Sequence, residues 1–433
     1  MKHHVMRSAG VAIAAALTLA ACSSDDGSSS TPDDTGSGSG DEPVTLTMSA
    51  WSLDSTPEFQ LLADEFNAIN PNVTVELQEY DAAEYDTQIT ADLSAGAAPD
   101  LYILKNLKYF ATFQDGEQLV DVSDVADGVG EGNGALDFYE VDGATWAVPY
   151  RQDTWFTYYN KSLFDEAGIA HPEGAITWDE YADLANQLND GLDATGSYQH
   201  SWQSTLQGFA LAQTPGADLF SGDFSFLAPY YDRVLAMQES GAQTDFATVQ
   251  TNQLTYQAQF GTQEAAMMNM GSWYVATLIA QQESGEAEDF EWGFMPAPQY
   301  DDSTLETPVS FGDPTAVGIN PQIDEAKMDA AKEFLAFVGS EDAASALAQI
   351  GIKPAFASDA VTEAYFSVAG LPQDELSQFA FGTHETLPEN PVSLDTAAIQ
   401  NILNDAHSAI LTDSVSVEDG IAEAQERVAN EVG

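Results

Sequence analysis

The most reactive side chains of this chain do not form a catalytic pattern. Cys22 is the only cysteine in 433 residues, which excludes a catalytic thiol or a thiolate zinc site further along. His384 and Glu385 begin like a zinc-binding helix, but no second histidine follows and Pro388 interrupts the run. With 70 acidic residues, carboxylate pairs occur by chance and do not identify a glycosidase. We therefore expect no enzyme activity, no metal and no cofactor.

Aromatic and polar side chains that follow the expected strands could instead bind a ligand. Trp51 and Asp54 follow the first strand, and Lys105 and Asn106 follow the third. In open α/β sheets ligands bind beyond the carboxyl ends of strands, so all four are candidate contacts. Trp51 could instead be a core residue, Asp54 a solvated loop acid, and Lys105 half of a structural salt bridge. Trp202, in a later loop, is a further candidate.

Alternating strands and helices must position these residues. The apolar pattern predicts strands at 44–48, 73–77 and 101–104, separated by helices over 57–69 and 83–94. This βαβαβ opening indicates an α/β fold with mostly parallel sheets flanked by helices. Later strands are expected at 146–150, 154–160, 291–295 and 316–319, and the last hundred residues are mainly helical.

The N-terminus is typical of an exported protein. A basic start and a short apolar run predict a signal peptide over residues 1–21 rather than a membrane span. Leu-Ala-Ala-Cys at 19–22 resembles a bacterial lipobox, which implies cleavage before Cys22 and its lipidation. An ordinary signal peptide with an incidental cysteine is the alternative. Residues 22–43 then form a disordered Gly/Ser/Asp tether, and the protein is extracytoplasmic and anchored to the cell membrane by lipid alone.

The charge balance is strongly acidic. Eleven Lys and Arg face 70 Asp and Glu, giving a net charge of −59, and Lys2 and Arg7 would leave with the signal peptide. Nucleic acid is excluded as a partner because it requires a basic face. The carboxylates are spread along the chain and predict a solvated acidic coat whose self-repulsion salt would screen.

Short segments match one family in order and spacing. They include Thr-Met-Ser-Ala-Trp at 47–51, Thr-Pro-Glu-Phe at 56–59, Ala-Pro-Asp-Leu-Tyr at 98–102, Trp-Ala-Val-Pro-Tyr at 146–150, Tyr-Asn-Lys-Ser-Leu-Phe at 159–164, Thr-Trp-Asp-Glu at 177–180 and Gly-Ser-Trp at 271–273. They resemble bacterial extracellular solute-binding proteins of the sugar-binding class, relatives of maltose-binding protein, over nearly all of residues 44–433. Gln263 departs from the family, which usually has glycine there. The resemblance implies a two-lobed, hinged type II periplasmic-binding-protein fold that clamps a ligand between its lobes.

The resemblance also implies roles for particular residues. Asp153 is similar to the family's cleft acid that accepts bonds from sugar hydroxyls, although an ion pair with Arg151 at the hinge is the alternative. Trp273 resembles the family's stacking tryptophan, with core packing as the alternative. Phe311 and Asp313 occupy the place of a hinge loop that often reaches the ligand. We count all five residues, Arg151 included, among the candidate contacts.

These inferences combine into one expected organisation. Lobe 1 comprises residues 44–150 with about 303–345 returning to it, and lobe 2 comprises 151–302 with the mainly helical 346–433. The protein is expected to be a monomeric receptor that captures a sugar or oligosaccharide and delivers it to the permease subunits of an ABC importer. A receptor for polyamines or other cations, and a secreted glycoside hydrolase, are the alternatives.

Overall fold

The first sheet is built mainly from the N-terminal part of the chain, with the strand order β2-β1-β3-β12-β6. Its strands are β1 (Val44–Trp51), β2 (Val73–Tyr80), β3 (Leu101–Leu104), β6 (Val148–Gln152) and β12 (Pro314–Ile319). β1 pairs in parallel with β2 and β3, whereas β12 runs antiparallel to β3 and β6. The predicted βαβαβ opening is confirmed, and β12 returns from much later in the sequence to extend the sheet.

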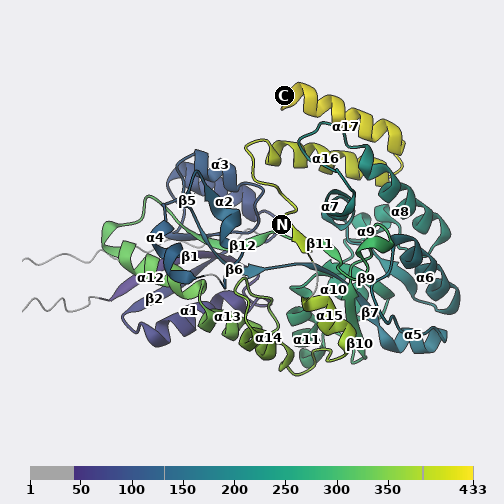
Figure 1. The fold of residues 1–433 in the computed structure, drawn as a ribbon, viewed down its shortest axis with the longest axis horizontal. Helices are drawn as coiled ribbons and strands as arrows, with labels where there is room; N and C mark the ends of the chain where they lie inside the picture. The colour runs from purple at the N-terminus through teal and green to yellow at the C-terminus, as the bar shows by residue number, and fades with distance from the viewer. Residues whose placement is uncertain (1–42, 131, 383–384, 433) are drawn as a thin grey trace, which may run out of the picture. The chain divides into compact units, whose positions relative to one another are not determined.

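The structure, a computed structural model, describes residues 43–130, 132–382 and 385–432 (Figure 1). The expected signal peptide, Cys22 and the tether up to residue 42 lie outside the described residues, as does His384.

The helices beside the first sheet bury one apolar face each. They are α1 (Glu58–Ile69), α2 (Tyr85–Ala95), α3 (Phe110–Asp115), α4 (Ser123–Val129), α12 (Met328–Val338) and α13 (Glu341–Ala348), with a small hairpin of β4 (Glu140–Val141) and β5 (Ala144–Thr145). On α1, Phe59 and Phe66 are fully buried, and Phe66 meets Phe334 of α12 edge-on at 5.1 Å. Ile69, which shares their spacing, is 64% exposed because the helix ends there.

The second sheet has the order β10-β7-β9-β8. Its strands are β7 (Trp155–Asn160), β8 (Thr195–Tyr198), β9 (Ala265–Gly271) and β10 (Trp292–Pro296). β7 runs antiparallel to both β9 and β10, and only β8 and β9 are parallel. The α/β class is confirmed, but the prediction of mostly parallel sheets is wrong: this sheet has one parallel and two antiparallel pairings, and the first sheet has two of each. Strands buried on both faces have the same apolar runs in either direction, so the sequence pattern cannot report direction.

Helices also pack around the second sheet (Figure 1). They are α5 (Lys161–Ala167), α6 (Trp178–Gly191), α7 (Ser204–Gln213), α8 (Ala228–Ser240), α9 (Phe246–Thr251), α10 (Tyr256–Gly261), α11 (Tyr274–Ser284), α14 (Asp359–Phe366), α15 (Glu375–Gly382), α16 (Thr396–Leu411) and α17 (Val417–Glu431). α6 begins with a capping box, in which Thr177 and Glu180 each accept from the other's backbone N–H. No helix within the described ranges is both long and apolar enough to cross a membrane.

Two crossovers connect the sheets and touch each other. Gln152 to Trp155 joins β6 to β7, and Phe311 to Pro314 joins β11 (Val309–Phe311) to β12; β11 itself pairs with β13 (Glu385–Leu387). The Gln152 side-chain amide donates to the carbonyls of Asp153 and Gly312, each at 3.1 Å. A Cβ atom on Gly312 would lie 2.2 Å from the Asp153 carbonyl oxygen, so only glycine allows the two backbones to approach this closely.

We expect Gly312→Ala to lower the free energy of unfolding by about 1–3 kcal/mol, because the backbone rather than a flexible side chain must move to admit the methyl group. Denaturant unfolding would measure the loss. Gly174→Ala is the matched control, since a Cβ there meets no atom within 4 Å, and its effect should stay within about 0.5 kcal/mol. Equal stability of the two variants would contradict the close approach.

Candidate functional site

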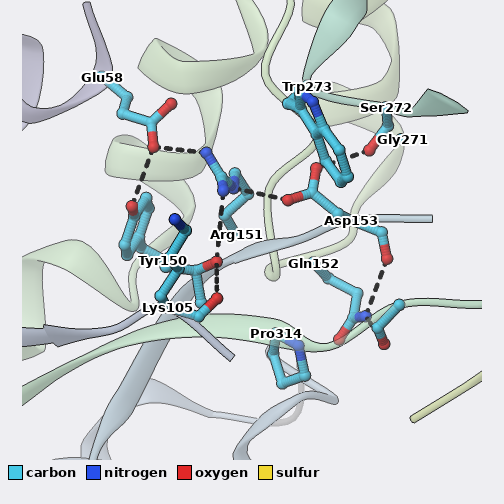
Figure 2. A network of polar contacts seen from close by, with 12 residues as sticks. Glu58, Lys105, Tyr150, Arg151, Gln152, Asp153, Gly271, Ser272, Trp273 and Pro314 are labelled. Atoms are coloured by element: carbon cyan, nitrogen blue, oxygen red, sulfur yellow. Dashed lines mark hydrogen bonds and ion pairs between the residues drawn. The ribbon is translucent and has the colours of Figure 1, made fainter. Parts of the chain in front are cut away.

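A buried polar network crosses from the first sheet to the second (Figure 2). Arg151 on β6 is only 8% exposed. Its Nη1 lies 2.5 Å from Glu58 Oε1, and its Nε lies 2.8 Å from Asp153 Oδ2. Tyr150 also donates its hydroxyl to Glu58 Oε1, at 3.0 Å. The guanidinium therefore holds the start of α1 and the first crossover together.

Asp153 extends this network to the second sheet. Its Oδ1 accepts a 2.7 Å hydrogen bond from the Ser272 hydroxyl at the end of β9. The backbone N–H of Ser272 in turn donates to the Thr154 carbonyl at 2.8 Å. The ion pair of Asp153 with Arg151, which the sequence left as an alternative, is thus present. A role of Asp153 in contacting a ligand remains a prediction.

Glu58 is a member of this network that the sequence reasoning missed. Burial raises the pKa of its carboxyl group, and the neighbouring Arg151 opposes that rise. Oε2 of Glu58 is buried and has no hydrogen-bond partner among the described residues. Glu58 does not stand out in the sequence, because an acid directly after Pro57 is an ordinary residue for the first turn of a helix.

An aromatic cluster adjoins Ser272. Trp273, the residue before α11, is partly exposed and meets Trp155 edge-on at 5.5 Å. Its six-membered ring lies over Gly271, where a Cβ atom would come within 1.9 Å of it. Trp202 is 41% exposed, and its ring centre lies 6.3 Å from that of Trp273. The candidates Trp202 and Trp273 are therefore neighbours, and Figure 2 shows Trp273 beside Asp153.

Two residues that the sequence reasoning did not select complete this aromatic cluster. His200 meets Trp202 edge-on at 4.4 Å, and Tyr256 lies 5.7 Å from Trp202. Burial lowers the pKa of His200 to about 4, so this ring is neutral at pH 7 and contributes shape and hydrogen bonding rather than charge.

The candidates after β1 and β3 divide between core and surface. Trp51 is the last residue of β1; it is buried and meets Phe59 and Tyr85 edge-on, as its core alternative required. The Lys105 ammonium lies 5.1 Å from the Trp51 ring centre and donates to the Ala82 carbonyl at 2.7 Å. The salt-bridge alternative for Lys105 is not realised among the described residues.

Two further candidates in the same region lie on loops. Asp54 is exposed in the loop between β1 and α1. The side-chain oxygen of Asn106 accepts a hydrogen bond from the backbone N–H of Lys108 at 3.0 Å and thereby stabilises the local turn.

The two candidates of the second crossover are structural in this conformation. Phe311 is fully buried and stacks on Trp155 at 5.0 Å, so we correct the expectation that it lines a binding surface: it belongs to the core of the second half. The Asp313 carboxylate is buried and accepts from the backbone N–H of Leu107 at 3.1 Å and the side-chain amide of Asn390 at 2.6 Å. It therefore ties the crossover to segments on both sides.

The arrangement favours ligand binding over bond cleavage. Flat indole rings stand beside a buried carboxylate and guanidinium, the combination that suits the apolar faces and hydroxyl groups of a sugar ring. No group of three or more His, Cys, Asp or Glu able to hold a metal ion occurs within the described part of the chain.

Comparisons with known proteins identify the family and the fold. Residues 50–345 match the family described as bacterial extracellular solute-binding protein. A sugar transporter from Rhizobium etli, solved in an open conformation, is 31% identical with a TM-score of 0.76, and the match covers 89% of this chain and 99% of that one. An ABC substrate-binding protein from Listeria monocytogenes in complex with cycloalternan has the same TM-score at 18% identity, covering 90% and 99%.

Curated sequence relatives match over a shorter stretch. Binding proteins of Brucella abortus and Brucella suis are 29% identical over 147 residues, which is 32% of this chain and spans about a third (33%) of their length. The solved structures confirm a two-lobed α/β fold for the described chain.

Proposed function

Because this chain belongs to the family of bacterial extracellular solute-binding proteins, we propose that it captures a sugar or oligosaccharide and delivers it to the permease of an ABC importer. The observation that carries this proposal is the pair of partly exposed indoles, Trp202 and Trp273, beside the buried Asp153 carboxylate. The sugar transporter of Rhizobium etli, 31% identical, supports the choice of ligand class. In this proposal the chain binds and releases its ligand and catalyses no reaction.

The mechanism is a shift between two arrangements of the lobes. We assign the elements β1 to β6 and β12 to α13 to one lobe, and the elements β7 to β11 and α14 to α17 to the other. This moves the lobe boundaries expected from the sequence to the crossovers after Gln152 and Phe311. The two touching crossovers at Asp153 and Gly312 are where such a movement would be concentrated. A ligand that contacts both lobes only when they close favours the closed state, and a permease that recognises that state receives only loaded receptor.

A ligand screen tests the proposal. Melting temperatures of the mature protein would be measured with neutral and acidic sugars, polyamines and amino acids, and each hit would be confirmed by calorimetry. A sugar that binds is expected to raise the melting temperature. At a free concentration of a hundred times its Kd, it should add about 2.7 kcal/mol to the free energy of unfolding. Stabilisation by a polyamine and by no sugar would favour the cation receptor. Release of shorter products from an oligosaccharide would favour the hydrolase.

Anchoring through Cys22 is a separate part of the proposal. Cys22→Ser is expected to move the protein from the membrane fraction to the soluble fraction without changing its melting temperature, because an anionic surface gains nothing from anionic lipids. Fractionation followed by immunoblotting would show the shift, with Ser23→Ala as the neighbouring control. A variant that stays in the membrane fraction would contradict lipidation at this cysteine.

A further inference from the structure

Basic residues are rare in this chain, and most of them are neutralised internally. Nine lie within the described ranges, and six of these form ion pairs with carboxylates: Arg151, Lys161, Arg233, Lys327, Lys332 and Arg427. Lys105, Lys108 and Lys353 form none within the described residues. In a chain with 70 acidic residues, three lysines without a carboxylate at contact distance require an explanation.

Lys353 lies beside the Arg151–Asp153 pair. Its carbonyl accepts from the backbone N–H of Gln152 at 3.3 Å, so this residue runs alongside the end of β6. Its ammonium lies over the Phe381 ring at 5.6 Å and has no oxygen acceptor among the described residues. Lys353 is partly exposed; burial lowers the pKa of its ammonium, and the nearby Asp153 charge opposes that change. Apart from its contact with the Phe381 ring, the Lys353 ammonium therefore has no fixed partner among the described residues.

Lys105 also lies beside the Arg151 network, but its surroundings differ from those of Lys353. Figure 2 shows it next to the Arg151 network, and the charge of Arg151 contributes to lowering the pKa of Lys105, after burial. Only one of its three donors is used, by the Ala82 carbonyl. The Asp86 and Asp81 charges oppose the lowering of the Lys105 pKa, so Lys105 has carboxylates of its own nearby. Asp153, the carboxylate near Lys353, is already shared by Arg151 and Ser272.

A partly buried ammonium without a counter-ion is costly unless something else supplies the negative charge. Resting on the sugar-binding function proposed above, we propose that the ligand is a saccharide that carries a carboxylate, and that Lys353 binds this carboxylate. The carboxylate, a single negative charge, suits the region better than a phosphate dianion, which the Asp153 and Glu58 carboxyl groups would repel. The aromatic cluster would hold the sugar ring, and Lys353 would select the acid.

Calorimetry with matched pairs of neutral and acidic sugars tests this assignment: glucose with glucuronate, galactose with galacturonate, and galactobiose with digalacturonate, plus glucose 6-phosphate. For the pair that fits, the uronate should bind about tenfold or more tightly than its neutral partner, as a charge-assisted bond requires. Lys353→Gln should bring that ratio close to one, whereas Lys353→Arg should retain most of it. Lys332→Gln, which removes a surface lysine paired with Asp124, is the matched control and should leave the ratio as it is.

The outcomes separate this inference from the proposed function. A protein that binds neutral sugars and not their uronates overturns the inference and leaves the sugar receptor standing. A uronate preference that survives Lys353→Gln, in a variant with the wild-type melting temperature, removes Lys353 from the site. If glucose 6-phosphate binds more tightly than glucuronate, the ligand carries a phosphate rather than a carboxylate, and the proposed ligand class is wrong. Binding of no sugar, neutral or acidic, overturns both proposals.

Discussion

Arg151→Met is expected to lower the free energy of unfolding by about 3–5 kcal/mol, because it leaves two carboxyl groups, those of Glu58 and Asp153, buried without their shared cation. Denaturant unfolding of both proteins would measure the loss. Arg427→Met is the matched control, since Arg427 also contacts two carboxylates, Asp405 and Glu431, but on the exposed surface of α17. Such a surface pair should contribute less than about 1 kcal/mol.

The deficit of Arg151→Met should also depend on pH. Burial already raises the pKa of Glu58, and the guanidinium opposes this, so removing Arg151 raises the pKa in the folded protein further. When the pKa of a carboxyl group is higher in the folded than in the unfolded protein, the group favours the folded state at pH values below its unfolded-state pKa. That stabilisation is lost as the pH rises through the folded-state pKa. The loss of unfolding free energy in Arg151→Met, relative to the wild type, should therefore be larger at about pH 8 than at about pH 5. Adding Glu58→Gln should recover part of the loss, and equal deficits for the Arg151 and Arg427 variants would argue against a buried network.

Trp273→Ala is expected to weaken binding of the sugar identified in the screen by about thirtyfold or more, equivalent to about 2 kcal/mol, because it removes a flat anchor from the site. Calorimetry gives the affinity, and thermal unfolding gives the stability of the same variant. Trp273→Phe keeps a flat ring and should retain much of the affinity. Trp146→Ala is the control for loss of an indole away from the aromatic cluster, since Trp146 packs at the edge of the first core.

The same variant distinguishes a ligand contact from a core residue. If Trp273 served only packing, its removal should cost about 3–5 kcal/mol of stability and leave the affinity of the remaining folded protein as it was. The partial exposure of this side chain favours the first outcome. An unchanged affinity with a large loss of stability would remove Trp273 from the proposed site.

The sequence predicted the elements of this fold better than their directions. The alternation of Val44, Leu46 and Met48 reports a strand, and the Thr177–Glu180 capping box reports a helix start, because both signals are local. The direction of β10 beside β7 depends on which connections bring each strand to the sheet, and no local pattern encodes that.

The candidate site was predictable in part for the same reason. Trp202 was selected from its loop position and Trp273 from its resemblance to the family's stacking tryptophan, and the structure places them together. Phe311 was selected from its place in the chain, but its burial is decided by Trp155 and Gly208, residues far away in sequence. Lys353 could have been selected from the sequence, because it is a lone lysine between apolar residues and a proline in a chain with few lysines.

The aromatic cluster has an optical consequence. Of the seven tryptophans in the chain, three form a connected series, with Trp155 nearly perpendicular to Trp273 at 5.5 Å and Trp202 at 6.3 Å on the other side. Indole emission responds to the polarity and contacts at the ring, and indoles this close couple their near-ultraviolet transitions. The protein therefore carries a built-in fluorescent and dichroic reporter at the proposed site, so occupancy can be followed in dilute solution without attaching a dye.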